Sequence, residues 1–160
     1  MLEDFSRSYE DAFVSHEWEL HNPTEFLTHV IAPIQPDVLI INFGHLAEMV
    51  THKTVSDLSP SFFEAARNSS KHVIWKTTTA RCDGGGAMDS YDFLQTLERD
   101  YGITTFDAYA VTAVITRHIL DGSVDRDKVC WDKFHFNSFV YREMNKALLL
   151  TIESLFNSSN

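Results

Sequence analysis

The chain has 160 residues, 44% of them hydrophobic, and a formal net charge of −10 at pH 7. This length suits one domain with a buried core, and twelve Phe residues favour a packed globule over a disordered chain. The negative charge makes a nucleic acid or an anionic membrane surface an unsuitable partner. No apolar run approaches the length of a membrane span, and the first residues lack a signal-peptide pattern.

Short apolar runs alternate with helical patterns, which is typical of a parallel sheet covered on both faces. The run at 37–43 is apolar almost throughout and predicts a central strand. In chain order, we expect a strand at 13–20, a helix at 24–32, a strand at 37–43, a helix at 60–68, a strand at 72–77, a helix that Asp89 or Ser90 caps and that ends at Gly102, a strand at 103–110, an irregular stretch, and a last helix after Asn137.

This order predicts an α/β fold with an open, doubly wound sheet, because crossovers between parallel strands are right-handed. Ligands of such sheets bind beyond the carboxyl ends of the strands. Three segments should meet at that edge, namely 42–45, 77–86 and 129–137. We therefore expect any functional site to lie there.

Asp132 and His135 lie in the last of these segments, just before the final predicted helix. At this spacing the carboxylate can accept the Nδ1 hydrogen of the imidazole and leave Nε2 as a general base. The alternative is an aspartate that caps a turn beside a solvated histidine, since the pattern often arises by chance. The position of the pair at the predicted edge favours the catalytic interpretation.

The sequence Asn42-Phe43-Gly44-His45 follows the predicted central strand. The side-chain amide of Asn42 and the backbone N–H of Gly44 are suitable donors to an oxyanion. Alternatively, Asn42 satisfies loop backbone groups and Gly44 adopts a positive φ. With Gly44, the neighbouring His45 and Arg81 of the segment 77–86 are the expected substrate-binding residues.

The cysteines and histidines show no metal-binding pattern. Cys82 and Cys130 lie too far apart for a Cys-x-x-Cys motif, and they are either two thiols or one disulfide that closes a long loop. The eight histidines form no His-Glu-x-x-His or His-x-His pattern. We therefore expect no metal and no cofactor.

Three blocks of this sequence occur in the same order in a known superfamily. They are DVLIINFGHL at 37–46, IWKT at 74–77, and Asp132-x-x-His135 followed by a helix containing MNKALL at 144–149. The chain thereby resembles the SGNH/GDSL esterases over about residues 13–150, and most closely their PC-esterase and trichome-birefringence-like branch of polysaccharide O-acyltransferases. The resemblance implies a flavodoxin-like three-layer sandwich with a mostly parallel sheet.

The resemblance also implies roles for individual residues. His135 would be the general base, Asp132 its orienting partner and Asn42 the oxyanion donor, in a Ser-His-Asp mechanism acting on acylated carbohydrate or another small ester. Relatives often have bridged cysteines in these regions, which favours a Cys82–Cys130 disulfide and a secretory compartment.

The sequence departs from this family at the nucleophile. The family's first strand ends in Gly-Asp-Ser, and this sequence contains no such block. Ser6, Ser8 and Ser15 have no apolar strand before them. We therefore expect a single domain over 1–160 that is N-terminally incomplete, lacks its first, central strand, and is inactive alone. The alternative is a catalytically silent binding module with the same fold.

Overall fold

The computed structural model describes residues 22–44, 55–85 and 89–157. The predicted strand at 13–20 and the expected substrate-binding residue His45 lie outside the described residues. The elements are α2 (Pro23–Phe26), η1 (Leu27–Ile31), β1 (Val38–Ile41), η2 (Val55–Asp57), α4 (Pro60–Ser69), β2 (His72–Lys76), α5 (Tyr91–Tyr101), β3 (Thr104–Phe106), α6 (Ala108–Leu120), α7 (Arg126–Val129) and α8 (Ser138–Asn157).

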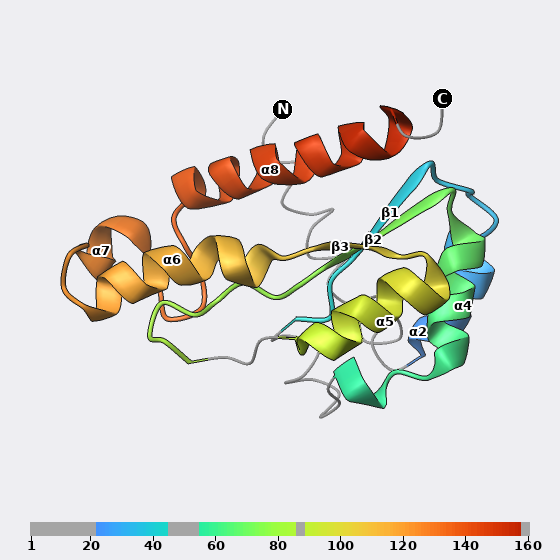
Figure 1. Ribbon diagram of the computed structural model, residues 1–160, viewed down its shortest axis with the longest axis horizontal. Helices are drawn as coiled ribbons and strands as arrows, with labels where there is room; N and C mark the ends of the chain where they lie inside the picture. Colours follow the sequence, from blue (N-terminus) through green and yellow to red (C-terminus); the bar gives the residue numbers. More distant parts are fainter. Residues whose placement is uncertain (1–21, 45–54, 86–88, 158–160) are drawn as a thin grey trace, which may run out of the picture.

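The three strands form one parallel sheet in the order β1-β2-β3. Figure 1 shows this sheet between α8 on one side and α4 and α5 on the other. The prediction of an α/β fold with a parallel sheet is thus confirmed for the described residues. The layers and the parallel pairing are compatible with a flavodoxin-like arrangement, whose full strand order stays a prediction.

Strand β2 is buried on both faces, which explains its continuous apolar run. Val73 and Trp75 point into a core shared with α4 and α5, and Trp75 is only 1% exposed. Ile74 points to the opposite face and packs with Met144 of α8. Strand β2 is also the middle strand of the described sheet.

Strand β1 is less buried than its sequence predicts. Val38, Leu39 and Ile41 are half-buried, and Ile40 is 42% exposed. Among the described residues, β1 pairs with β2 alone and therefore forms an edge of the sheet. The central position of the strand at 37–43 stays a prediction, because the strand predicted at 13–20 lies outside the described residues.

The helix ends follow local capping chemistry. Ser90 caps α5 by accepting a hydrogen bond from the backbone N–H of Phe93, at 3.2 Å. Gly102 ends the same helix in the left-handed conformation, with φ of 63°. Both positions agree with the boundaries predicted from the sequence.

Helix α6 begins where the sequence analysis places the end of a strand. The strand predicted at 103–110 ends at Phe106, and the irregular stretch expected after it contains α6. Asp107 explains the change of structure, because its carboxylate accepts a hydrogen bond from the backbone N–H of Ala110 at 2.9 Å and caps the new helix.

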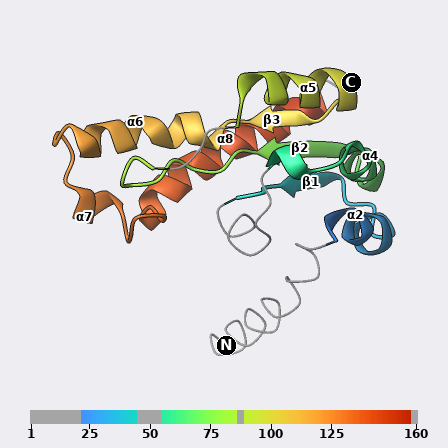
Figure 2. The same ribbon diagram turned by 90° about the horizontal axis from the view of Figure 1, so that it is seen from below.

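Helices α6 and α7 extend the molecule beyond the carboxyl ends of the strands. Figure 2 shows them at the opposite end from α2 and α4. The disulfide Cys82–Cys130 joins the segment after β2 to the residue after α7. This end of the molecule therefore carries the loops in which the site is expected. None of the helices in the described part of the chain has the length and apolar character needed to cross a bilayer.

Candidate active site

A tight turn between Cys130 and Phe136 carries the predicted acid–base pair. These two residues form an isolated antiparallel bridge, and both are buried. Inside the bridge, the backbone N–H of Trp131 donates to the carbonyl of His135 at 2.9 Å. The intervening residues are thereby confined to a short loop before α8.

Within this turn, Asp132 and His135 form the predicted pair. Their Oδ2 and Nδ1 atoms lie 2.8 Å apart. The other carboxylate oxygen of Asp132 accepts the backbone N–H groups of Phe134 at 2.6 Å and of His135 at 2.7 Å. The carboxylate therefore fixes both the turn and the ring, and it leaves Nε2 of an exposed imidazole available to a reacting group.

The hydrogen bonds of Asp132 also set its charge. The bond from the His135 side chain, followed by the backbone bond from Phe134, lowers the pKa of Asp132 from 3.8 to about 2. The carboxylate is thus ionised at neutral pH. A fixed negative charge beside Nδ1 stabilises the imidazolium that forms when Nε2 takes a proton.

The titration of Asp132 can be measured directly by carboxyl-carbon NMR. We expect a midpoint near 2 in the native chain, and a higher midpoint in His135→Ala, which removes the strongest of the hydrogen bonds. Because folding lowers this pKa, the stabilisation of the turn is complete above 3.8 and is lost as the pH falls through about 2. A native midpoint at 3.8 or above would contradict the pairing.

The disulfide holds the turn against the segment that follows β2. Of the two states that the sequence leaves open, the structure has the bridge between Cys82 and Cys130. The backbone N–H of Cys82 also donates to the carbonyl of Lys133 at 3.0 Å. A covalent bond and a hydrogen bond therefore tie the acid–base turn to the carboxyl side of β2.

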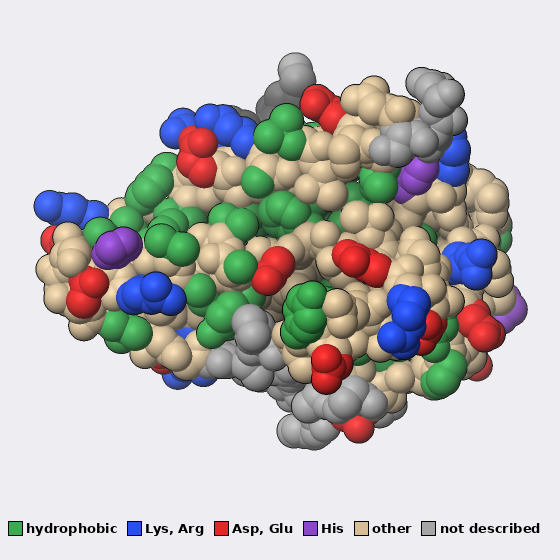
Figure 3. Space-filling view, in the orientation of Figure 1, with side chains coloured by type: hydrophobic (Ala, Val, Ile, Leu, Met, Phe, Trp, Pro, Cys, Tyr) green, Lys and Arg blue, Asp and Glu red, His purple; other side chains and the backbone are tan. Residues whose placement is uncertain are grey.

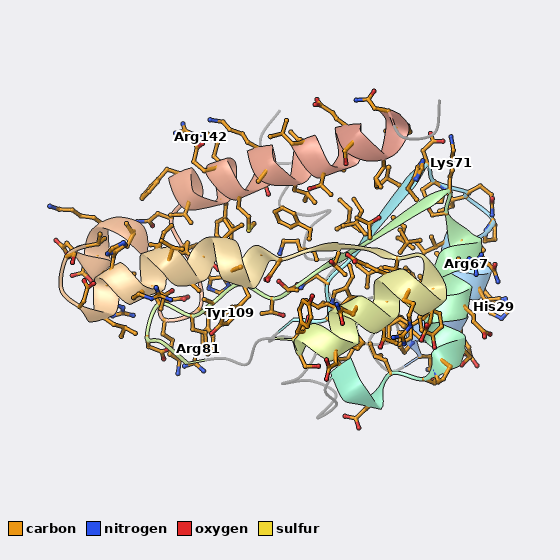
Figure 4. The ribbon with its side chains drawn as sticks, in the orientation of Figure 1. His29, Arg67, Lys71, Arg81, Tyr109 and Arg142 are labelled. Carbon is orange, nitrogen blue, oxygen red and sulfur yellow. A yellow bond between two sulfur atoms is a disulfide. The ribbon has the colours of Figure 1, made fainter. Side chains whose placement is uncertain are left out.

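Arg81, expected to bind substrate, contacts residues on both sides of this junction. Its guanidinium forms an ion pair with Asp83, and Nε donates to Oδ1 at 3.0 Å. The guanidinium also lies 4.6 Å from the ring centroid of Phe134. Figure 4 shows Arg81 in the loop below α6. Arg81 therefore supports the turn, and a direct role in substrate binding stays a prediction.

Asn42 and Gly44 form a second group at the carboxyl end of β1. Asn42 Nδ2 donates to the carbonyl of Lys76 at 2.8 Å, which fixes the amide against the end of β2. A Cβ added at Gly44 would lie 2.8 Å from Asn42 Oδ1 and 3.3 Å from Thr78 Oγ1. Gly44 is therefore needed where the backbone passes this amide, and the second N–H of Asn42 remains as the predicted oxyanion donor.

The segment from Lys76 to Cys82 connects the two groups. Asn42 is bonded to one end of this segment, and the turn of His135 is bonded to the other. Both therefore lie on the carboxyl side of the sheet, as predicted. Six residues span at most about 20 Å when extended. The closer approach of Asn42 to His135 that the mechanism needs stays a prediction.

The sequence analysis gives no role at the site to three groups near this edge. Burial lowers the pKa of Lys76 at the end of β2, and it raises the pKa of Asp89, whose carboxylate accepts Nε1–H of Trp75 at 3.0 Å. Trp131, directly before Asp132, is 83% exposed. The sequence could have pointed to Trp131, because it is adjacent to the acid–base pair. It could not have pointed to the burial of Lys76, because that burial depends on tertiary packing.

No three His, Cys, Asp or Glu side chains within 22–44, 55–85 and 89–157 are grouped so as to hold a metal ion. The described residues of the site provide an oriented histidine base, a turn anchored by the disulfide, and the amide of Asn42 as a donor.

Neither a protein-family model nor a curated protein nor a solved structure matches this chain.

Proposed function

We propose that the chain is the acid–base part of an ester hydrolase or O-acyltransferase domain that acts on acylated carbohydrate. A serine hydroxyl attacks the acyl carbonyl while His135 Nε2 takes its proton, and the amide of Asn42 stabilises the oxyanion. His135 then returns the proton to the departing sugar oxygen. Water or an acceptor hydroxyl finally attacks the acyl-serine and breaks its acyl–oxygen bond, while His135 passes the proton of the attacking hydroxyl to the serine oxygen, which gives hydrolysis or transfer.

The geometry of Asp132 and His135 is the observation that carries this proposal. The carboxylate of Asp132 lies 2.8 Å from Nδ1 and accepts two backbone hydrogen bonds. These contacts hold the His135 ring with Nε2 free to accept a proton, which is the orientation of a general base. A solvated histidine beside a capping aspartate does not require a disulfide-anchored turn. The anchoring of the turn by the disulfide therefore favours the catalytic interpretation over the structural one.

The position of β1 at the edge of the described strands supports a source for the serine. This sequence has no Gly-Asp-Ser block, and β1 presents half-buried apolar side chains at an edge that no other described strand occupies. A parallel strand added there would be buried on pairing, and its carboxyl end would lie beside Asn42. In the proposal, that strand ends in the nucleophilic serine.

A serine-reactive fluorophosphonate probe tests the proposal. We expect no labelling of this chain, and stoichiometric labelling of a longer form that carries a Gly-Asp-Ser strand ahead of it. Serine-to-alanine replacement in that strand is the matched control and should abolish the label. Labelling of the 160-residue chain itself would show that it contains its own nucleophile.

The second candidate is a non-catalytic binding module with the same fold. The bond from Asn42 to the Lys76 carbonyl favours it, because this amide already has a structural role. In this case Asp132 and His135 would only hold the turn. An unlabelled longer form that still binds a glycan would support this candidate over the enzyme.

A further inference from the structure

Trp131 is the most exposed large hydrophobic side chain in the described part of the chain, at 83%. It makes no stacking contact with another aromatic ring of the described residues. An indole left in water gives up the burial that stabilises most tryptophans, so such exposure often marks a binding surface. Because Trp131 directly precedes Asp132, the binding surface that it marks lies beside the acid–base pair.

The register of the turn places Trp131 directly across from His135. Cys130 and Phe136 are bridged and point inward, where both are buried. The next pair outward is Trp131 and His135, joined by the 2.9 Å backbone hydrogen bond. Both side chains of this second pair are exposed, Trp131 to 83% and His135 to 60%.

The charges around this face balance. Arg81 is ion-paired with Asp83 and lies over the ring of Phe134, while Lys133 lies 4.9 Å from the centroid of that ring. Both cations are thus held by neighbours, and Asp132 adds a negative charge. Figure 3 shows acidic and basic side chains interspersed over the α6–α7 end of the molecule. A phosphate or nucleotide finds no excess of positive charge here, whereas an uncharged ligand meets no repulsion.

We propose that Trp131 is the platform on which a neutral sugar ring stacks, with the acylated hydroxyl of that ring directed at His135. The apolar C–H face of a pyranose matches the indole in shape and polarity. Its hydroxyl groups remain free to hydrogen-bond to the polar groups of the turn. The proposal specifies the substrate class of the proposed function and rests on it for the acyl reaction, but not for the binding of the sugar.

A microarray of neutral oligosaccharides tests the binding step with the chain as it is. We expect at least one glycan class to bind, Trp131→Ala to weaken binding by about ten- to a hundredfold, and Trp131→Tyr to restore most of it. Leu150→Ala, which trims a side chain 65% exposed on α8, should leave binding unchanged. Binding of no glycan, or equal binding by Trp131→Ala, would overturn the proposal. Trp131-dependent binding to phosphatidylcholine vesicles in place of glycans would also overturn it.

Kinetics in a serine-bearing form, meaning the longer form that carries the Gly-Asp-Ser strand, separate the proposed sugar platform from the proposed enzymatic function. Trp131→Ala should raise KM for the acetylated form of the bound glycan and leave hydrolysis of 4-nitrophenyl acetate, which carries no sugar, within about twofold. Equal losses on both substrates would make Trp131 a support of the turn and overturn the platform. If neither ester is turned over by the parent form, the proposed function fails, while Trp131-dependent glycan binding still stands or falls by the microarray.

Discussion

Replacing Cys82 and Cys130 together by alanine is expected to lower the free energy of unfolding by about 4 kcal/mol at 25 °C. The bridge joins residues separated by 48 positions, and a cross-link over a loop of this length removes much of the conformational entropy of the unfolded chain. Both residues are buried in a hydrophobic cluster, so the loss of their two sulfur atoms also removes packing contacts. Urea unfolding followed by circular dichroism measures the difference.

Reduction of the native chain provides the matched control. Phosphine reductant should shift the urea midpoint of the native chain toward that of the double alanine variant, and it should not shift the variant itself. Titration of thiols in the unfolded, unreduced chain should find none. Two titratable thiols, or a midpoint insensitive to reductant, would contradict the bridge. A stable bridge is typical of proteins in oxidising compartments.

Reduction should also loosen the acid–base turn. Without the bridge, the bond from the Cys82 N–H to the Lys133 carbonyl is the described backbone link between the turn and the segment after β2. The contact between Asp132 and His135 is local to the turn, so it should survive reduction. The disulfide therefore determines where the pair lies relative to the sheet, whereas the sequence of the turn determines the pair itself.

The elements that the sequence predicts correctly have local causes. Helix α5 has a serine cap and a terminal glycine, and α8 has apolar side chains at helical spacing. The sequence analysis misses helix α6 because it assigns 103–110 to a strand and leaves the following residues irregular. Val111, Thr112, Val114 and Ile115 are β-branched, which lowers their helix propensity. The cap at Asp107 was the available signal for this helix.

In the site too, the sequence predicts the contacts that form locally and not those that depend on distant residues. The spacing of Asp132 and His135 predicts their contact, because the contact forms within a single turn. The exposure of Trp131 depends on the register between Cys130 and Phe136, which spacing alone does not fix. The edge position of β1 depends on strand neighbours that are distant in the sequence, and no local pattern encodes it.

His135→Ala in a serine-bearing form is expected to lower kcat/KM for ester hydrolysis by about 10²- to 10⁴-fold. The serine would lose the base that removes its proton, while the fold should be unaffected because the exposed side chain contributes little to the core. Asp132→Asn should also reduce the rate, since the amide no longer stabilises the imidazolium and no longer selects the tautomer with Nε2 unprotonated. Steady-state hydrolysis of 4-nitrophenyl acetate measures both losses.

His118 offers a matched control within the same chain. Its Nδ1 atom lies 3.6 Å from Asp121 Oδ2, also at a spacing of three residues, and both side chains are exposed at the end of α6. His118→Ala removes an equivalent surface pair outside the anchored turn, and we expect it to leave kcat/KM within about twofold. Similar activities for His135→Ala, His118→Ala and the parent form would defeat the proposed mechanism, because a general base that can be removed without loss is not taking the proton.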